Sequence, residues 1–539
     1  MTPLSFFRKP VRATAALSLE EKIGQMMMIG FSGTSLSADV RGRLASGKAG
    51  FVLLFYHNVE SVEQVVDLTN DIHAARSPAP MIWTDQEGGN VVQFNEMAAT
   101  ALSPMGMAAT GRCATARRAG HIIGGEMKAL GVDGVFAPVL DVNTQPDNPI
   151  IGFRSFSDDP RVVARFGRCL AKGLRRGGVA ACGKHFPGHG GVLVDSHRML
   201  PRFTGDNETL DAVHIKPFRD LIRARLLDAV MPAHVVYPGK STEIASLSPY
   251  WLGGVLRGGL GFPGLIISDC LEMGAVAGTL DPGTAALRAV RAGADVISVS
   301  RSSEIQKIVF NTLLAAAGRG ELPISRVDES VKRILAFKRA RGLLNQVACV
   351  DPRRALRSAR SHYDAEFRMA VDSVTLARDR DGVLPLDSAT DLLLVEWKKA
   401  VATEALSQAR ARSVLAAPLN RRFRQVDTVM LELEPRLPEY LSARLRTAGK
   451  VVAAVFSRSP QTESIQAAAV REILNLRPDA IVVALGNPYD LRKFPAVRVY
   501  LAVYGYRKVQ AEALAAVLAG AARPGGKLPV RIPGVVSIS

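Results

Sequence analysis

The chain has 539 residues, a length that accommodates three or four average domains, or two if one is a large barrel, and that excludes a small disulfide-stapled scaffold. Hydrophobic residues make up 47% and charged residues 22%, a balance that excludes an intrinsically disordered chain. The excess of 68 Lys and Arg over 50 Asp and Glu gives a net charge of +18, which favours anionic partners but does not determine the fold.

The N-terminal segment carries Arg8, Lys9 and Arg12, but Ala13–Leu19 lacks the long apolar core of a secretion signal. No run reaches about 18 consecutive apolar residues, so we expect no membrane span. The five cysteines are odd in number and lack paired spacing, which indicates neither a disulfide framework nor a cysteine metal site. Together these features predict a cytoplasmic protein.

Between residues 20 and 300, short apolar runs alternate with longer amphipathic stretches, as in repeated βα units around a parallel sheet. The runs are Gln25–Phe31, Gly50–Tyr56, Met81–Asp85, Val135–Asp141, Val179–His185, Ala229–Val235, Leu265–Asp269 and Asp295–Val299. Eight such units predict an α/β fold of the TIM type, a closed (β/α)8 barrel.

Polar residues follow directly after several of these runs. In a (β/α)8 barrel the active site lies at the C-terminal ends of the strands, so such residues are candidates for chemistry. The segments are Trp83–Gly89, Pro138–Asp141, Lys184–Gly190, Met231–His234 and Ile266–Asp269. Because all would meet at one rim, they predict a single site there.

A second domain is predicted after a charged helical pattern from Asp328 to Leu344. We expect a barrel domain over residues 1–345, a linker over 346–362 and a smaller α/β sandwich over 363–539. Its predicted buried strands are Asp391–Glu396, Val451–Phe456, Ala480–Ala484 and Val499–Val503. Gly486-Asn487-Pro488 matches no phosphate-binding loop, so no nucleotide site is expected there.

The densest basic run lies within the helical pattern that ends the barrel domain. Lys332-Arg333, Lys338-Arg339 and Arg341 are interleaved with apolar residues. This spacing favours a solvated helix face, with a phosphate-binding patch as the alternative. Elsewhere the basic residues are scattered along the sequence.

Several sequence blocks carry a resemblance to a known family. They are Asp85–Gly89, Asn148-Pro149 through Gly152, Arg154-Ser155-Phe156, KHFPGHG at 184–190, VDSH at 194–197, and Ser268-Asp269 with Leu271-Glu272-Met273. In this order they resemble blocks of family 3 glycoside hydrolases, on the β-N-acetylglucosaminidase branch. Ser373–Leu376, Leu384–Leu386 and Pro524–Pro529 are similar to that family's C-terminal domain. The resemblance spans nearly the whole chain and implies a TIM-type barrel followed by an α/β sandwich.

The resemblance implies that Asp269 is the catalytic nucleophile. A retaining glycosidase needs a carboxylate that attacks the anomeric carbon and an acid that protonates the departing oxygen. Asp269 ends the seventh apolar run, where a strand end holds a carboxylate firmly. The alternative is an Asp that only caps the following helix.

His197 is the candidate acid and base, with Asp195 as its partner. The two side chains are two residues apart, so an extended segment would point them to one side, and the carboxylate would then fix the tautomer of the imidazole. This pair resembles the His–Asp dyad of the branch. The preceding Gly188–Gly191 is expected to let the loop swing over a bound sugar. The alternative is a surface histidine without a catalytic role.

Lys184, His185, Asp85 and Arg154 are the candidate substrate-binding residues, each assigned by its position in a family motif. We expect Lys184, His185 and Arg154 to donate to sugar hydroxyls and Asp85 to accept from them. The alternative for each is a buried structural polar group.

Four histidines, at positions 185, 189, 197 and 234, raise the alternative of a zinc site. His185 and His189 are four residues apart, but Pro187 and Gly188 between them argue against one helix face. The resemblance implies an enzyme that needs no metal and no other cofactor.

Three positions depart from the family pattern. Asn90 stands where the family usually has Arg, which puts one substrate or structural contact in doubt. Gly191-Val192 replaces the common Asp-Thr, which puts the anchoring of the loop in doubt. Cys270 replaces the second Asp of the usual Ser-Asp-Asp, while the proposed nucleophile remains.

The leading functional hypothesis is an exo-acting β-N-acetylglucosaminidase that removes terminal non-reducing GlcNAc with retention, from peptidoglycan fragments. The expected partner is a GlcNAc-containing oligosaccharide, a muropeptide, rather than nucleic acid. One alternative is a phosphorylase, because a histidine acid does not repel phosphate as a carboxylate would. Another is a catalytically silent glycan-binding protein, because of the altered loop and missing arginine.

Overall fold

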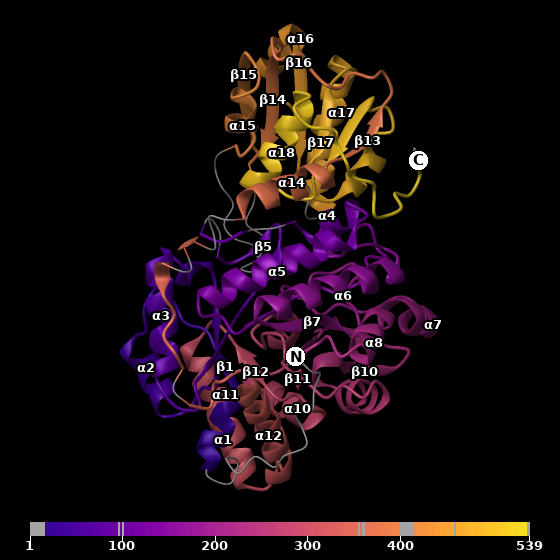
Figure 1. The fold of residues 1–539 in the computed structure, drawn as a ribbon. Helices are drawn as coiled ribbons and strands as arrows, with labels where there is room; N and C mark the ends of the chain where they lie inside the picture. The colour runs from indigo at the N-terminus through magenta and orange to yellow at the C-terminus, as the bar shows by residue number, and fades with distance from the viewer. Residues whose placement is uncertain are drawn as a thin grey trace.

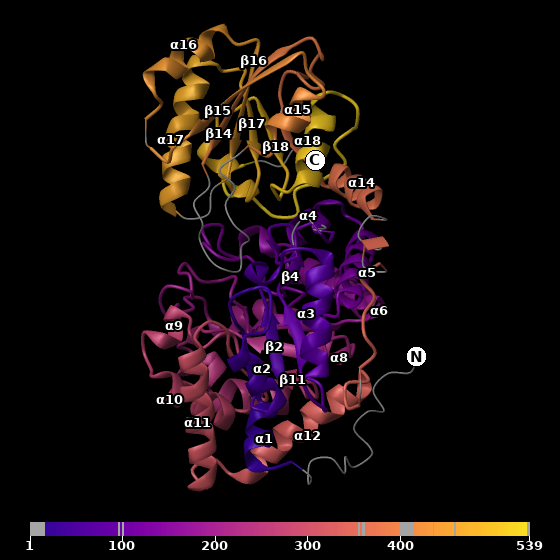
Figure 2. The ribbon, with the colours of Figure 1, turned by 90° about the vertical axis from the view of Figure 1, so that its left-hand side faces the viewer.

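The computed structural model describes residues 17–94, 97–99, 102–345, 347–353, 356–357, 362–398, 413–434, 436–456 and 460–535. The basic N-terminal residues Arg8, Lys9 and Arg12 and part of the predicted linker lie outside these ranges. Figures 1 and 2 show a larger body, formed by residues up to helix α12 (Ile324–Ala340), and a smaller one formed by the C-terminal part of the chain.

The larger body is a parallel (β/α)8 barrel, as predicted. Its 8-stranded sheet has the order β11-β8-β7-β6-β3-β2-β1-β12, and every pair is parallel. A parallel bridge between Ile267 and Val296 closes the sheet between β11 and β12. The strands are β1 (Met27–Ile29), β2 (Phe51–Leu54), β3 (Met81–Thr84), β6 (Gly134–Val135), β7 (Ala180–Phe186), β8 (Ala229–Pro232), β11 (Leu265–Ile266) and β12 (Ile297–Val299).

A helix follows each strand and packs its apolar face on the sheet. In chain order these are α2 (Ala38–Ala45), α3 (Val62–Ala74), α5 (Cys113–Ala129), α6 (Pro160–Gly177), α8 (Lys216–Arg223), the π-helix η6 (Tyr250–Gly259), α10 (Pro282–Ala292) and α11 (Ser303–Gly318). Several begin at a side chain that caps the first turn, such as Ser37, Ser61 and Asp281. Helix α1 (Leu19–Gln25) precedes β1, and α12 (Ile324–Ala340) follows α11.

Strand β6 is shorter than the predicted run Val135–Asp141. Regular pairing stops at Val135 and resumes as a single bridge between Val139 and Lys184 of β7. Pro138 lies in the gap, and a proline has no N–H to donate to a neighbouring strand. The chain from 136 to 141 still runs beside β7 and brings Asp141 to the rim.

The smaller body contains a 6-stranded sheet in the order β13-β18-β17-β16-β14-β15, parallel except for β13. Its strands are β13 (Thr375–Asp379), β14 (Asp391–Trp397), β15 (Gln425–Leu431), β16 (Lys450–Val455), β17 (Ile481–Ala484) and β18 (Val499–Ala502). Helices α16 (Glu439–Thr447) and α17 (Pro460–Leu476) cover one face, and α14 (Tyr363–Ser373), α15 (Ala416–Asn420) and α18 (Lys508–Leu518) cover the other (Figure 2). This is the predicted α/β sandwich.

The two edge strands of this sheet, β13 and β15, were not among the predicted strands. The first residues of β15, Gln425 to Thr428, are polar or only partly buried, because an edge strand faces solvent. The four predicted strands are the inner ones, and their runs are apolar because both faces are covered by helices.

The basic run at 332–341 is not simply a solvated helix face. Lys338 is fully buried, and its Nζ donates to Gln25 Oε1 at 2.7 Å and to Gly50 O at 3.0 Å. Burial lowers the pKa of this amine to about 7. Gln25 and Gly50 lie just before β1 and β2, so α12 closes the N-terminal end of the barrel and carries Lys338 into it.

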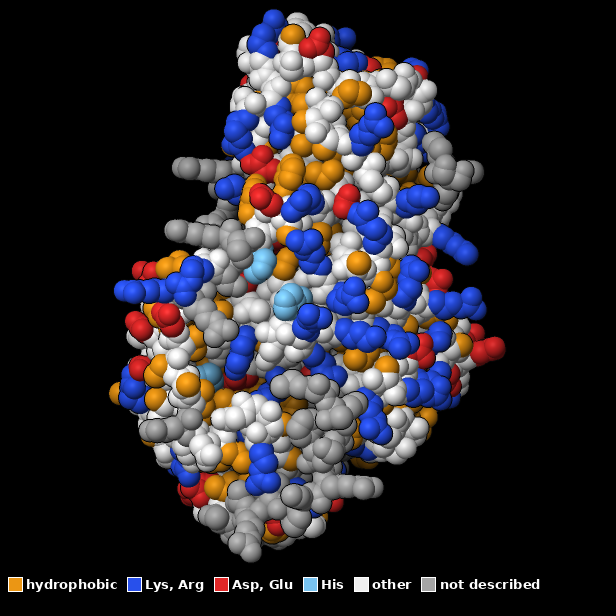
Figure 3. All heavy atoms as spheres, viewed as in Figure 1, with side chains coloured by type: hydrophobic (Ala, Val, Ile, Leu, Met, Phe, Trp, Pro, Cys, Tyr) orange, Lys and Arg blue, Asp and Glu red, His pale blue; other side chains and the backbone are white. Residues whose placement is uncertain are grey.

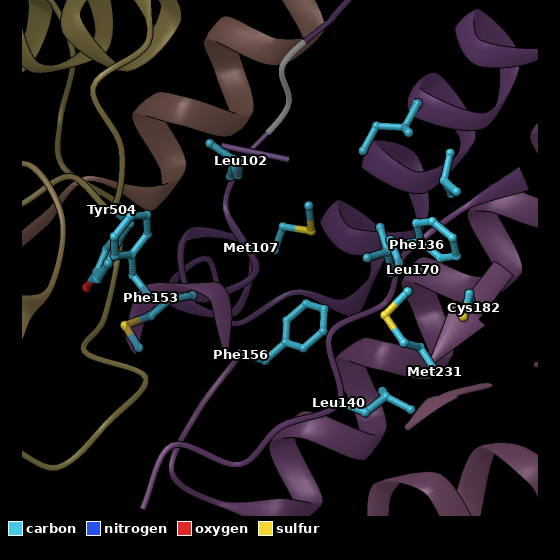
Figure 4. Packing of buried hydrophobic residues seen from close by; sticks show 14 of the residues in the cluster. Leu102, Met107, Phe136, Leu140, Phe153, Phe156, Leu170, Cys182, Met231 and Tyr504 are labelled. Atoms are coloured by element: carbon cyan, nitrogen blue, oxygen red, sulfur yellow. The ribbon is translucent and has the colours of Figure 1, made fainter. Parts of the chain in front are cut away.

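The two bodies share one hydrophobic core. A single cluster of buried side chains includes Leu102 and Phe153 from the barrel and Tyr504 from the smaller body (Figure 4). Phe153 also meets the Phe456 ring edge-on, with centroids 6.2 Å apart. The C-terminal domain therefore packs on the loops after β3 and β6, which carry part of the predicted site.

No helix in the described ranges is both long and apolar enough to cross a lipid bilayer.

Candidate active site

A pocket opens at the C-terminal ends of the barrel strands. Its lining is Leu53, Phe55, Asp85, Phe136, Arg154, Lys184, His185, His197, Met231, Asp269, Cys270, Met273, Ser298, Ser300 and Arg301. Six of the seven predicted site residues therefore share one pocket, and the seventh, Asp195, is hydrogen-bonded to His197. Segments from seven βα units, far apart in the sequence, meet here because strands of a closed parallel barrel all end at one rim.

Asp269 follows β11 at the rim, and its Oδ1 accepts a hydrogen bond from the Cys270 N–H at 2.8 Å. Burial raises the pKa of this carboxyl, but the nearby imidazoles of His234, His185 and His197, together with the Cys270 N–H, outweigh burial and lower the pKa below its ordinary 3.8. Asp269 is thus held as a carboxylate in a partly enclosed pocket, the form that a nucleophile requires.

His197 and Asp195 are paired, but not in the way that the spacing suggested. The segment is a turn, not an extended strand. Asp195 Oδ1 accepts from the His197 backbone N–H at 2.9 Å and lies 2.8 Å from His197 Nδ1. The short Asp side chain bonds its own backbone two residues on, and this geometry brings the ring back over the carboxylate. Burial raises the pKa of Asp195, but the hydrogen bonds with His197 outweigh burial. The pKa of Asp195 therefore lies below its ordinary value.

The loop that carries His197 is attached on both sides. The N–H groups of Gly274 and Ala275 donate to His197 O and Ser196 O, both at 3.1 Å, and Ser196 Oγ lies 3.0 Å from His189 Nε2. The glycines before the loop do not act as free hinges in this conformation. A Cβ on Gly190 would lie 2.0 Å from Val142 O, so glycine is required there for close packing.

Four charged side chains form a chain of ion pairs along one wall. Lys184 Nζ lies 2.5 Å from Asp85 Oδ1 and 2.7 Å from Glu87 Oε1, and Arg154 binds both oxygens of Glu87 at 2.8 and 3.0 Å. Glu87 was not among the predicted site residues, although it lies in the Asp85–Gly89 block. Burial raises its pKa, but Arg154 and Lys184 outweigh burial and lower the pKa to about 2. The ionised Glu87 therefore orients both cations.

His185 is held by Asp141, which sequence reasoning had placed at a strand end without a role. His185 Nδ1 lies 2.7 Å from Asp141 Oδ2, while Asp141 Oδ1 accepts from the backbone N–H groups of His185 and His189 at 3.2 and 2.6 Å. Burial opposes ionisation of Asp141, but these partners lower its pKa to about 2. The ring of His185 is thereby oriented with its Nε2 edge away from Asp141.

The other two histidines of the zinc alternative have different partners. His234 contacts Ser246 Oγ at 2.6 Å through Nδ1 and Cys270 O at 3.1 Å through Nε2. Burial lowers the pKa of His189 to about 4, which keeps this ring neutral at physiological pH. Within the described ranges no group of three or more His, Cys, Asp or Glu side chains is placed to hold a metal ion.

Comparisons with known proteins place the barrel that carries this pocket in a family. A family model described as "Glycosyl hydrolase family 3 N terminal domain" matches residues 18–337. The chain belongs to glycosyl hydrolase family 3. It is therefore a glycoside hydrolase, and the matched region is the barrel that bears the pocket.

Relatives of this family 3 chain cover the barrel or the whole length. The "Beta-hexosaminidase" of Methylococcus capsulatus is 39% identical over 53% of this chain and 86% of the relative. The "Beta-hexosaminidase A" of Pseudoalteromonas piscicida is 27% identical over 98% of this chain and 99% of the relative. The solved structure of a glycoside hydrolase family 3 beta-N-acetylglucosaminidase from Paenibacillus sp. str. FPU-7 matches with a TM-score of 0.86 at 33% identity, over 96% of this chain and 100% of that one.

Each of the three departures from the family pattern has a contact in this structure. Asn90 is buried, and its Oδ1 accepts from the Tyr506 N–H of the C-terminal domain at 3.3 Å. Gly191 packs against the Phe203 ring, which a Cβ would approach within 2.5 Å. Cys270 Sγ accepts from Ser300 Oγ at 3.1 Å, and burial raises the pKa of its thiol to about 11.

The C-terminal domain holds both loops that carry the Glu87–Arg154 pair. Arg507 donates to Gly89 O at 3.2 Å and to Asn90 O at 3.0 Å, in the turn just after Glu87. Asn487 Oδ1 accepts from the Phe153 N–H at 2.8 Å, in the turn that carries Arg154. Gly152 in that turn admits no other residue, since a Cβ would lie 2.4 Å from Asn487 Oδ1.

We predict that Asn487→Ala weakens sugar binding without touching the sugar. Loss of the acceptor releases the Phe153 N–H and loosens the turn, so KM for an aryl N-acetylglucosaminide should rise about tenfold while kcat changes less than about threefold. Steady-state kinetics with thermal unfolding as a folding check measure this. Asn487→Asp keeps the acceptor and should restore KM.

Arg112→Ala is the matched control, because Arg112 pairs with Asp372 across the same domain boundary at an exposed position. Its kinetics should stay like those of the parent enzyme. Equal changes in Asn487→Ala and Arg112→Ala, with no rescue by Asn487→Asp, would show that Asn487 contributes only to domain docking.

Proposed function

We propose that this family 3 hydrolase is a retaining, exo-acting β-N-acetylglucosaminidase that removes terminal non-reducing GlcNAc through a covalent glycosyl-Asp269 intermediate. The observation that carries the proposal is that the ionised Asp269 and the Asp195-paired His197 line one pocket. The printed names of the relatives, beta-hexosaminidase and beta-N-acetylglucosaminidase, support the sugar class.

In the first step Asp269 attacks the anomeric carbon while the protonated His197 gives its proton to the departing oxygen. In the second step His197 takes a proton from water, and the water oxygen displaces Asp269 from the sugar. Asp195 fixes His197 through Nδ1, which leaves Nε2 as the atom that exchanges protons.

Asp85, Lys184, Arg154 and His185 bind the hydroxyls of the same sugar. Glu87 pairs with Lys184 and Arg154, Lys184 also pairs with Asp85, and Asp141 is hydrogen-bonded to the His185 ring. These contacts hold the four side chains in fixed orientations before substrate arrives. Such preorganisation lowers the entropy lost on binding and places the anomeric carbon against Asp269.

The proposed substrate is a peptidoglycan fragment, and the proposed compartment is the cytoplasm, where imported muropeptides would be recycled. Arg301 is exposed and lines the pocket, which places a guanidinium in the site where such a fragment would bind. Muropeptides carry carboxylates, which a guanidinium recognises well.

A panel of nitrophenyl β-glycosides tests the sugar class directly. The proposal expects turnover of the N-acetylglucosaminide and little turnover of the glucoside or xyloside at equal concentration. Equal rates on all three would overturn the N-acetyl preference. Release of GlcNAc from the non-reducing end of a muropeptide, followed by mass spectrometry, tests the substrate class.

Phosphorolysis is the second candidate, and the imidazole acid is the observation that favours it. The pocket presents Lys184, Arg154 and Arg301 beside His197, so an incoming phosphate would meet cations rather than a catalytic carboxylate acid. We expect hydrolysis: phosphate up to high concentration should neither accelerate turnover nor yield GlcNAc 1-phosphate. Formation of the sugar phosphate would make the enzyme a phosphorylase.

A silent glycan-binding protein was suggested by the altered loop and the missing arginine. Asn90 accepts a hydrogen bond from the Tyr506 N–H, Gly191 lies against the Phe203 ring, and the His197 loop remains in place. That hypothesis predicts binding without turnover, so Asp269-dependent hydrolysis would exclude it.

A further inference from the structure

The surface of helices α5 and α6 carries a cluster of exposed cations, and Figure 3 shows basic side chains across the middle of this face of the molecule. The exposed basic residues are Arg117, Arg118 and Lys128 on α5 and Arg161, Arg165, Arg168, Lys172 and Arg176 on α6. Neither helix exposes an acid, since Glu126, the one acidic residue of the pair, is buried. Sequence order alone had made these residues look scattered.

On α6 the cations form a row. Positions 161, 165, 168, 172 and 176 follow the helical repeat, so their side chains lie on one face along the whole length of the helix. The opposite face, with Val163, Phe166, Leu170 and Leu174, is buried. The buried apolar face fixes the orientation of α6, so the row of cations faces solvent.

Glycines bring the second helix close beside this row. A Cβ on Gly120 would lie 2.4 Å from Leu170 O, and one on Gly173 would lie 2.2 Å from Arg117 O. The backbones thus approach more closely than larger residues would allow. The result is a broad face made of two adjacent helices, with Arg117 and Arg118 beside the α6 row.

Within the described ranges, most of these cations have no acidic partner. Lys128 pairs with Asp133, and Arg175 at the edge pairs with Asp228. The remaining cations of the face, Arg117, Arg118, Arg161, Arg165, Arg168, Lys172 and Arg176, make no ion pair with any residue in the described ranges. In contrast, Arg424, Arg444 and Arg498 of the C-terminal domain each pair with an Asp.

We propose that the α5–α6 face docks this enzyme on the phosphates of an anionic lipid bilayer. Clusters of four to eight Lys and Arg on a helical surface bind acidic headgroups, with each cation near the surface strengthening binding. Docking is peripheral and electrostatic, because the face carries no exposed large apolar side chain to insert. The catalytic pocket lies at the barrel rim and is not part of this face.

The shape of the face favours a bilayer over nucleic acid. A DNA major groove is about 12 Å wide and admits one helix, whereas two packed helices are about 18 Å or more across. Neither helix exposes an aromatic side chain on which single-stranded bases would stack, since Phe166 is buried. A plane of phosphates is the surface that matches a row of cations on a broad face.

Co-sedimentation of the full-length enzyme with vesicles tests the proposal. The vesicles contain phosphatidylcholine alone or with about 30% phosphatidylglycerol, a content chosen to give an acidic surface. We expect binding only to the acidic vesicles and its loss at high salt, since the interaction is screened. The triple variant Arg165→Gln, Arg168→Gln and Lys172→Gln should bind about 100-fold more weakly, because Gln keeps the helix but removes the charge.

A matched triple variant, Arg424→Gln, Arg444→Gln and Arg498→Gln, lowers the net charge equally in another domain and should bind like the parent. Unchanged hydrolysis of an aryl glycoside by both variants shows intact folds. Failure of the parent to bind acidic vesicles at low salt, or equal losses in both variants, would overturn the proposal. Tighter binding of duplex DNA than of vesicles, dependent on the same α6 residues, would assign the face to nucleic acid instead.

Discussion

Asp269→Ala should abolish hydrolysis of N-acetylglucosaminides, with kcat falling by roughly 10⁴-fold or more, because no glycosyl-enzyme bond forms without the carboxylate. The kcat of Asp269→Asn should fall by a similar factor, although its amide oxygen can still accept from the Cys270 N–H. The pair of variants separates the loss of the nucleophile from a loss of local structure. Steady-state kinetics and thermal unfolding measure both.

Chemical rescue makes the Asp269 test sharper. Azide added to Asp269→Ala enters the vacated space and attacks the sugar, so a glycosyl azide of inverted configuration should appear with an activated substrate. Mass spectrometry of the parent enzyme, quenched during turnover, should find the sugar mass on the peptide that contains Asp269. Near-parental turnover in Asp269→Asn would refute the assignment.

The lowered pKa of Asp269 determines in which direction its ionisation makes the activity depend on pH. A nucleophile is active when ionised, so activity is lost only as pH falls through its pKa, which lies below 3.8 in the folded enzyme. Any change in kcat/KM between about pH 5 and 8 must come from another group. A pH profile of the parent and of His197→Ala identifies that group.

We expect His197→Ala to lower kcat by about 10²- to 10⁴-fold on a disaccharide or muropeptide, the usual contribution of a general acid. The loss should be much smaller on a nitrophenyl glycoside, because nitrophenol leaves without protonation. Kinetics on both substrate types measure these effects.

His121→Ala is the matched control for the surface-histidine alternative, since His121 is exposed on α5 and outside the pocket. It should behave like the parent on every substrate. If His197→Ala also kept full activity on the natural substrate, the acid assignment would be wrong. Asp195→Asn should lower activity in the same substrate-dependent way, because it weakens the support of the ring.

Local patterns were sufficient to predict the barrel and most of the second sheet. Buried parallel strands have apolar runs and helices have amphipathic ones, and both patterns can be recognised within a few consecutive residues. Edge strands such as β15 have a solvated side and a polar sequence, so they lack the apolar run by which a buried strand is predicted. Asp269 and His197 were assigned by their resemblance to family motifs, and only Asp269 lies directly at the end of a predicted strand run.

The supporting residues were harder to predict. Glu87 and Asp141 bind cations and histidines that are far away in sequence, and nothing local distinguishes them from other acids near a strand end. The Asp195–His197 pair was expected from an extended segment, whereas a turn forms it. Lys338 sits in a basic run, yet packing of α12 across the barrel end buries it.

The sequence by itself determined the order of βα units, the second α/β sandwich and the residue types at the ends of the strands, because each depends on neighbours within a few residues. Only the tertiary structure decided which of these residues meet, how Asn487 and Arg507 support the pocket from another domain, and how the cations of α5 and α6 form one face. Barrel closure and helix packing bring together groups that are far apart along the chain, and no local pattern encodes those distances.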